Sequence, residues 1–219
     1  MQDAEDTEDM DRRIVAAAMD LAATHGWRRT GLAEVARAAG VPLGALYRRF
    51  PTRAHLLAGL SRLADAAVLA DEPAAPDPDA PDPEAEEEPP RDRLFDVMMR
   101  RFDALLPYRD GLASVTRDLR REPLTALAFA PHIARSMAWM LRAARIDPDA
   151  PGGSALVAGL VAVHARVMRT FLADDTADLA RTMAALDAEL RRGESWWAAL
   201  RRRDSRRASQ TEPVDAPAG

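Results

Sequence analysis

Cysteine is absent from the 219 residues of the sequence, which excludes disulfide bonds, thiolate metal sites and cysteine nucleophiles. The four histidines are far apart, and no two have the spacing of a metal-binding pair. Lysine is absent as well, so all 30 basic residues are arginines. No glycine-rich phosphate loop and no nucleophile elbow occurs. We therefore expect no catalytic residues, no metal and no cofactor, and a function other than that of an enzyme.

Long apolar runs are also missing. No segment approaches the roughly 18 to 20 consecutive apolar residues of a membrane-spanning helix. The first ten residues are acidic, whereas a secretory signal begins with basic residues. These two absences predict a cytoplasmic protein.

Charge is unevenly distributed along the chain. The formal net charge is −5, which by itself argues against a partner as acidic as a nucleic acid. Residues 11–60, however, contain eight arginines and three acids. The acids are concentrated in residues 1–10 and 71–88 instead. A locally basic domain can still attract DNA phosphates, because affinity follows the field at the contact surface.

Helical periodicity runs through the sequence, and no alternating run of β-branched residues predicts a strand. The fold class is therefore all-α, with about nine helices. Gly26 stands where the first helix should end, and Thr52 is placed to cap the fourth. The predicted helices cover residues 11–25, 32–39, 43–49, 53–69, 91–106, 109–120, 123–145, 154–173 and 177–202, the last with Thr176 as its N-cap.

Composition divides the chain into five parts. Residues 1–10 are predicted to be an acidic disordered terminus, and residues 11–70 a small helical domain. Residues 71–90 hold seven prolines and nine acids, a composition that cannot bury enough apolar surface to offset the entropy of ordering. They are predicted to be a flexible linker. Residues 91–203 then form a second helical domain, and residues 204–219 a disordered tail.

The most specific pattern lies in residues 35–50, which read VARAAGVPLGALYRRF. They predict a helix, a tight turn at Gly40 and a second short helix. This is the outline of a helix-turn-helix, in which the second helix can lie in the major groove of DNA while the first braces it.

Residues 12–60 resemble the TetR family of one-component transcriptional regulators, without a gap over about 50 residues. The matching positions are Arg13-Ile14, Ala17-Ala18, Leu21, His25-Gly26-Trp27, Thr30, Val35-Ala36, Ala39-Gly40-Val41, Gly44, Leu46-Tyr47, Phe50-Pro51 and Leu56-Leu57. The resemblance implies that residues 11–70 are a DNA-binding domain and residues 91–203 a ligand-binding and dimerisation domain. The framework residues Trp27, Val35, Leu46, Phe50 and Leu57 are expected to form one small core.

The recognition helix departs from the family pattern. The family usually has serine or threonine where this chain has Pro42 and Ala45, and often lysine where it has Leu43. None of these three side chains can donate a hydrogen bond to a phosphate or a base edge. Gly31 stands where a capping serine or threonine is common. DNA binding would therefore depend on other side chains.

The resemblance implies that Tyr47 contacts phosphate and that Arg53 holds the DNA backbone, while Arg48 and Arg49 are further donors. The alternative for each arginine is a solvated surface position. The predicted DNA-binding residues are Gly31, Leu43, Gly44, Tyr47, Arg48, Arg49 and Arg53.

The resemblance also implies an apolar effector site in the second domain. Methionine and phenylalanine at helical spacing suit an irregular apolar ligand, but the same pattern is typical of an ordinary core. Likewise, His164 is either a ligand contact or a hydrogen-bonded core histidine. The candidate pocket residues are Met98, Met99, Phe102, Phe129, Met137, Met140, His164, Met168 and Phe171.

Two functions follow from the resemblance. The first is a homodimeric regulator, usually a repressor, that leaves its double-stranded DNA operator when an apolar small molecule binds. The second is a lipid-binding accessory protein similar to those of ubiquinone biosynthesis, without sequence-specific DNA binding. Trp196-Trp197 among arginines could lie on an anionic membrane surface in that case. The alternative for these tryptophans is a domain or dimer core.

Overall fold

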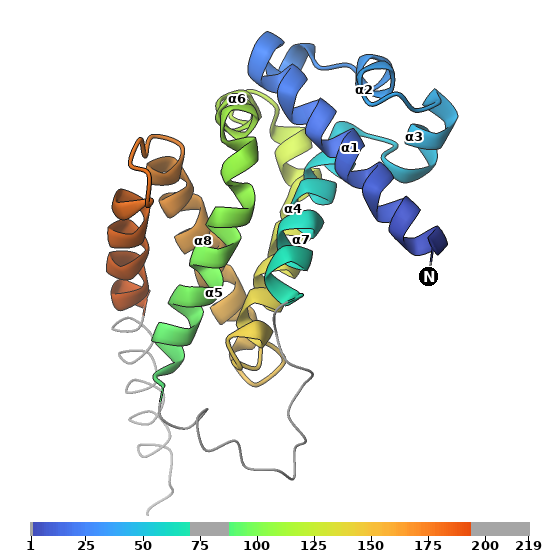
Figure 1. Cartoon of the computed structure of the whole chain (residues 1–219). Coiled ribbons are helices and arrows are strands. Elements are labelled where there is room, and N and C mark those ends of the chain that lie inside the picture. Colours follow the sequence, from blue (N-terminus) through green and yellow to red (C-terminus); the bar gives the residue numbers. More distant parts are fainter. Residues whose placement is uncertain (1, 71–87, 194–219) are drawn as a thin grey trace, which may run out of the picture.

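The computed structural model describes residues 2–70 and 88–193, and within them the fold is helical throughout (Figure 1). The predicted tail and almost all of the predicted linker lie outside the described residues. The helices are α1 (Gln2–His25), η1 (Trp27–Arg29), α2 (Leu32–Ala38), α3 (Leu43–Arg49), α4 (Arg53–Leu69), α5 (Pro90–Leu105), η2 (Leu106–Tyr108), α6 (Arg109–Leu119), α7 (Pro123–Ala143) and α8 (Gly153–Phe171), followed by a helical segment over residues 180–193.

The all-α prediction is confirmed, and most boundaries fall within two residues of those predicted. Gly26 ends α1 with a φ of +90°, a conformation that favours glycine. Thr52 caps α4, because its side chain accepts a hydrogen bond from the backbone N–H of His55. Both boundaries could be predicted from the sequence because each depends on one residue type at one position.

The start of α1 corrects the prediction. Residues 2–10, expected to be disordered, belong to the helix. Arg12 forms an ion pair with Glu8, one turn earlier, at 2.9 Å. A pair of this spacing with the acid on the N-terminal side stabilises a helix, and acids near a helix start complement its dipole. The acidic composition therefore supports the helix here.

The last helical segment also begins later than predicted. Residue 180, not 177, starts the helix, and Leu179 before it has a φ of +54°. A residue in this left-handed region cannot continue a right-handed helix. Thr176 still accepts a hydrogen bond from the backbone N–H of Ala180 at 2.9 Å. Trp196 and Trp197 lie outside the described residues.

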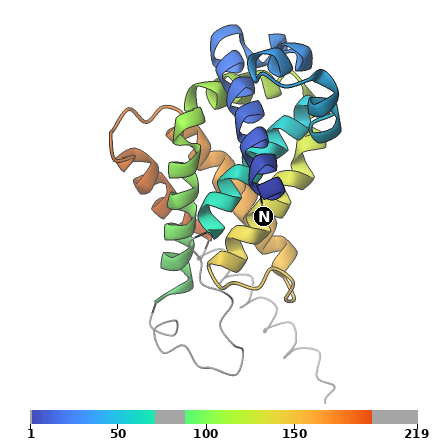
Figure 2. The same ribbon diagram turned by 45° about the vertical axis from the view of Figure 1, so that its right-hand side comes forward.

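The helices form two lobes. We call α1 to α3 and the first turns of α4 the N-terminal lobe, and the rest of the described chain the second lobe. Figure 2 shows α2 and α3 at one end of the molecule, with the second lobe beneath them. α4 joins the lobes and packs against α5 and α7, while α1 lies against α6. The second helix of the helix-turn-helix, α3, is therefore held by elements that also contact the second lobe.

The predicted framework residues are buried, although not in a small core of their own, because the apolar cluster that contains them continues into the second lobe. The five residues all belong to this one continuous cluster: Trp27, Val35, Leu46, Phe50 and Leu57. Leu46 and Phe50 come from the inner side of α3 and its C-terminal end. Burial of these side chains fixes α3 on the lobe and leaves its opposite side for solvent.

α1 and α6 are tightly packed at Gly111. A Cβ on this residue would lie 2.6 Å from the carbonyl oxygen of Met19 and 2.9 Å from its Cα. We expect Gly111→Ala to lower the free energy of unfolding by about 2 kcal/mol, since backbone atoms must move apart to admit the methyl group. Urea denaturation measures the change.

Gly44→Ala is the matched control for this substitution. Gly44 is helical, and the nearest atom to its added Cβ is the tip of Arg48 at 3.9 Å. Alanine there should leave stability unchanged or raise it by up to about 1 kcal/mol. Equal stability of the two variants would show that the α1–α6 crossing can accommodate the added methyl group.

Candidate nucleic-acid interface

One side of α3 faces solvent. The side chain of Tyr47 is 66% exposed and that of Leu43 is 53% exposed, and Gly44 and Arg48 are exposed with them. Leu43 and Gly44 lie three or four residues before Tyr47 and Arg48, and this spacing makes them neighbours on the helix surface. The structure therefore brings four of the seven predicted DNA-binding residues together on the recognition helix.

The starts of α2 and α3 have no polar cap. Pro42 is the N-cap of α3 and Gly31 the N-cap of α2, and neither makes a side-chain capping hydrogen bond. Ala45 is half-buried beside Leu46. The hydroxyl groups missing from the sequence are thus not replaced by another side chain at these caps.

Arg49 is directed toward α1. Its Nε donates to Asp11, and its Nη2 donates to the backbone carbonyl of Thr7 at 3.3 Å. The hydrogen bond to Asp11 raises the pKa of Arg49, and burial opposes this only in part. This guanidinium therefore fastens α3 to α1 in the structure described here.

Arg53 is held even more fully. Its Nη1 donates to the carbonyls of Trp27, at 3.1 Å, and Arg28, at 3.3 Å. Its Nη2 donates to Glu122 at 2.9 Å, and the guanidinium lies 5.8 Å from the centre of the Trp27 ring. Glu122 belongs to the second lobe, 69 residues away in the sequence. No local pattern could have predicted this partner.

Further bonds join the lobes around η1. The backbone N–H of Trp27 donates to the hydroxyl of Ser114 at 2.9 Å. That of Arg28 donates to Asp118 at 3.0 Å, and the Arg28 side chain lies 3.7 Å from Glu122. α6 and the turn after it thus hold the segment that precedes the helix-turn-helix.

Fewer arginine side chains of the N-terminal lobe are available to an external partner than the composition of the lobe suggests. Among arginines of the lobe whose surroundings the structure describes, Arg29, Arg37 and Arg48 are exposed, and their side chains make no hydrogen bond or ion pair. Of these, Arg48 lies on the solvent-facing side of α3. Tyr47 and Arg48 are therefore the polar pair best placed to meet an anionic surface.

The predicted effector residues form the core of the second lobe. Six of the nine are buried: Met98, Phe102, Met137, Met140, His164 and Phe171. The other three, Met99, Phe129 and Met168, are half-buried. Phe102 stacks on His164 at 5.5 Å between ring centres and lies 5.2 Å from Phe171. Burial, with a smaller effect from Arg101, lowers the pKa of His164 to about 3.

A buried polar cluster lies beside this core and was not predicted from the sequence. Arg101 of α5 is only 1% exposed, and it donates to Asp65 of α4 and, at 3.0 Å, to Ser61. Ser136 of α7 donates to Asp65 at 2.7 Å. A signal was present in the sequence, because Arg101 falls on the apolar stripe of its helix, three residues after Met98.

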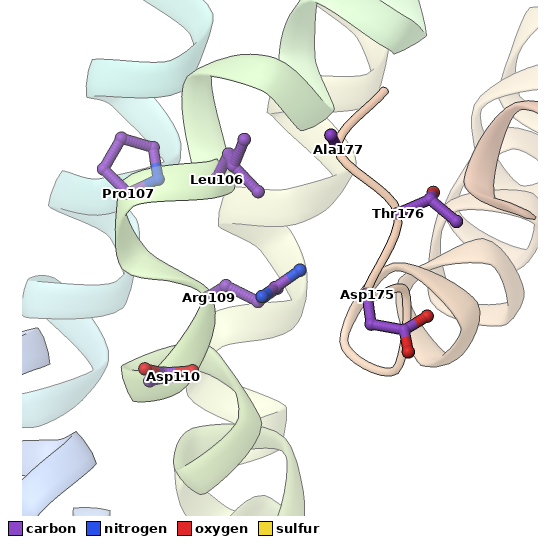
Figure 3. A pocket seen from close by; sticks show the side chains of 7 residues that line it. All are labelled: Leu106, Pro107, Arg109, Asp110, Asp175, Thr176 and Ala177. Carbon is purple, nitrogen blue, oxygen red and sulfur yellow. The ribbon is translucent and has the colours of Figure 1, made fainter. Parts of the chain in front are cut away.

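A surface hollow of about 390 Å³ opens where η2 and α6 meet the loop after α8 (Figure 3). Its lining includes Arg109, Asp110 and Asp175, which does not suit an apolar effector. Burial would raise the pKa of neighbouring Asp174, but hydrogen bonds from Thr176 and Thr182 outweigh it and hold that pKa below its usual range. None of the predicted pocket residues lines this hollow.

α8 differs from the sequence prediction in one respect. By length and composition alone it is apolar enough to cross a membrane, with a mean hydropathy of 1.2, and 28% of that window is buried inside the protein. The same test is passed by helices that pack inside or between proteins in water. Four small residues lie on its exposed side: Ala155, Ala158, Gly159 and Ala165.

Comparison with known proteins agrees with this architecture. The family described as "Bacterial regulatory proteins, tetR family" matches residues 14–60. The TetR transcriptional regulator from Nitrosomonas europaea ATCC 19718 is 18% identical, with a TM-score of 0.62 over 83% of this chain and 96% of that one. A TetR transcriptional regulator from Rhodococcus sp. RHA1 is 23% identical, with a TM-score of 0.56 over 85% and 97%. No curated protein matches the sequence.

Proposed function

Since residues 14–60 are a helix-turn-helix domain of the TetR family on a chain with the fold of TetR regulators, we propose that the protein is a cytoplasmic DNA-binding repressor. It acts as a homodimer on a double-stranded, pseudo-palindromic operator. An apolar small molecule, bound in the second lobe, releases it. The observation that carries this proposal is the solvent-facing side of α3, where Tyr47 and Arg48 lie together.

The chemistry of α3 favours phosphate contacts over base reading. Tyr47 and Arg48 can donate to phosphate oxygens, and Arg48 can also reach a guanine edge. Leu43 offers only an apolar contact, which suits a thymine methyl group. Positioning on the operator would therefore rest on Tyr47 and Arg48 together with the exposed arginines of η1 and α2.

Dimerisation is supported by α8. Its exposed side carries alanines and a glycine, and these small residues allow another helix to approach closely. Arg166 of α8 pairs with Glu189 of the segment 180–193, so these two helices lie side by side. A second copy docking on both helices would cover this surface and present two recognition helices to the two operator halves.

Release requires a difference in affinity between two arrangements of the lobes. An effector that binds both arrangements equally would shift nothing. The apolar core of the second lobe, around Phe102, Met137 and Met140, is the place where a ligand would favour one arrangement. The lobe contacts at η1 then carry the change toward α3.

Selection of genomic fragments by the purified protein tests this function. We expect enrichment of a palindrome, and the double substitution Tyr47→Ala/Arg48→Ala should weaken binding to it by about 10- to 100-fold at 0.1 M salt. Arg135→Ala, at an exposed position in the middle of α7, removes the same charge away from α3 and should change affinity less than about twofold.

Two results would contradict the proposal. Unchanged DNA binding by the double variant would show that α3 is not part of the DNA interface. Failure to enrich any palindrome, together with lipid that co-purifies with the protein and binding to anionic liposomes, would favour the lipid-binding accessory function instead.

A further inference from the structure

Glu122 holds two arginines of the N-terminal lobe from the second lobe. Its Oε2 accepts from Arg53 at 2.9 Å, and its Oε1 lies 3.7 Å from Nε of Arg28. We propose that Glu122 competes with DNA phosphate for these two guanidinium groups, so that the described arrangement is the one with low affinity for DNA. This inference rests on the proposed function and adds the residue that controls it.

The carboxylate is well placed to neutralise both cations. Glu122 is 14% exposed and Arg53 is 29% exposed, so the pair is partly shielded from water. Thr125 donates to the same Oε2 at 3.1 Å and keeps the carboxylate oriented. A phosphate that approached Arg53 would meet this negative charge first and would have to replace it.

The position of Glu122 distinguishes it from Asp11, which also holds an arginine of this lobe. Asp11 binds Arg49, but Asp11 lies on α1, within the same lobe as α3. Motion of the second lobe does not change that pair. Glu122 is the N-cap of α7 and directly follows the turn after α6. A shift of this turn changes the distance to Arg53 and therefore the charge that the lobe offers to DNA.

The exchange is energetically easy in both directions. Arg53 keeps an anionic partner in either arrangement, because phosphate takes the place of the Glu122 carboxylate. Phosphate is an equally good partner for a guanidinium group, and its binding releases counterions from DNA. DNA therefore selects molecules in which Glu122 has withdrawn, and an effector that keeps Glu122 on Arg53 favours release.

Glu122→Gln tests the proposal, because glutamine keeps the size of the side chain and removes its charge. At 0.1 M salt we expect this variant to bind duplex DNA about three- to tenfold more tightly than the wild type. The slope of log K against log salt should become steeper by about one to two, one unit for each arginine that gains a phosphate. Circular dichroism melting checks that the variant is folded.

Asp118→Asn is the matched control. Asp118 carries the same charge on the same side of the lobe junction, but within the described residues its carboxylate accepts only from the backbone N–H of Arg28, at 3.0 Å. We expect less than about a twofold change in affinity and an unchanged salt slope. If the two variants gained DNA affinity equally, the change in net charge alone would explain the effect, and the proposal would be overturned.

Weaker or unchanged binding by folded Glu122→Gln would also overturn it, because Glu122 would then position Arg53 for DNA or play no part. The measurement uses both the selected operator and a random duplex of equal length. If no operator is selected, the proposed repressor function fails, while the random duplex still decides whether Glu122 limits binding to a phosphate backbone.

Discussion

Asp65→Ala should lower the free energy of unfolding by about 3 to 5 kcal/mol, because it leaves the charge of Arg101 buried without a partner. Arg101 is almost inaccessible to water, and its other polar partner, Ser61, is neutral. Ser136 loses the acceptor of its hydrogen bond in the same variant. Burial lowers the pKa of Arg101, which shows how unfavourable this site is for an isolated cation.

A double substitution separates the loss of the pair from the loss of packing. Asp65→Ala/Arg101→Met removes both charges and fills much of the space of the arginine stem, so most of the lost stability should return. Asp149→Ala is the control, since it breaks the exposed pair of Arg142 and Asp149 and should cost less than about 1 kcal/mol. Urea denaturation of all three variants gives the comparison, and a double variant as unstable as Asp65→Ala would contradict this explanation.

Acidification should destabilise the protein through His164. Its pKa in the folded chain is about 3, against an ordinary value of 6.5, so the folded state excludes a proton that the unfolded state binds. The stability from burying neutral His164 is fully present above pH 6.5 and is lost as the pH falls toward 3. The loss is roughly 1 kcal/mol for each pH unit, or about 3 kcal/mol between pH 7 and pH 4.

His164→Leu isolates this effect from the titration of the carboxylates. The variant keeps an apolar side chain against Phe102 but has no group to protonate, so its stability should fall less steeply than that of the wild type below pH 6.5. Met137→Leu, a buried change without a titrating group, should shift stability by the same amount at every pH. If the free energies of unfolding of the wild type and His164→Leu fell in parallel with pH, a group other than His164 would be responsible for the loss.

The helix-turn-helix could be predicted from the sequence because its signals are local. Gly26, Gly40 and Thr52 each mark a boundary by their own chemistry, and Leu46 and Phe50 mark the inner side of the recognition helix by their spacing. Of the two arginines that the resemblance made exposed donors, Arg48 is exposed, whereas Arg49 is half-buried against α1.

The partners of the arginines could not be predicted in the same way. Arg49 and Arg53 read as free surface cations, yet each is bound by an acid from a distant segment, Asp11 or Glu122. Which acid meets which base depends on how the helices cross, and no periodicity contains that information. Arg101 was hidden for a different reason, because an arginine in a helix is expected at the surface.

The close contact of Gly111 with Met19 also limits how the two lobes can move. Backbone atoms that nearly touch cannot slide past each other, so α6 and α1 can change their relation only by turning about this crossing. Since α1 also packs against α2 and α4, a change in the angle at this crossing would be passed on to the elements that hold α3.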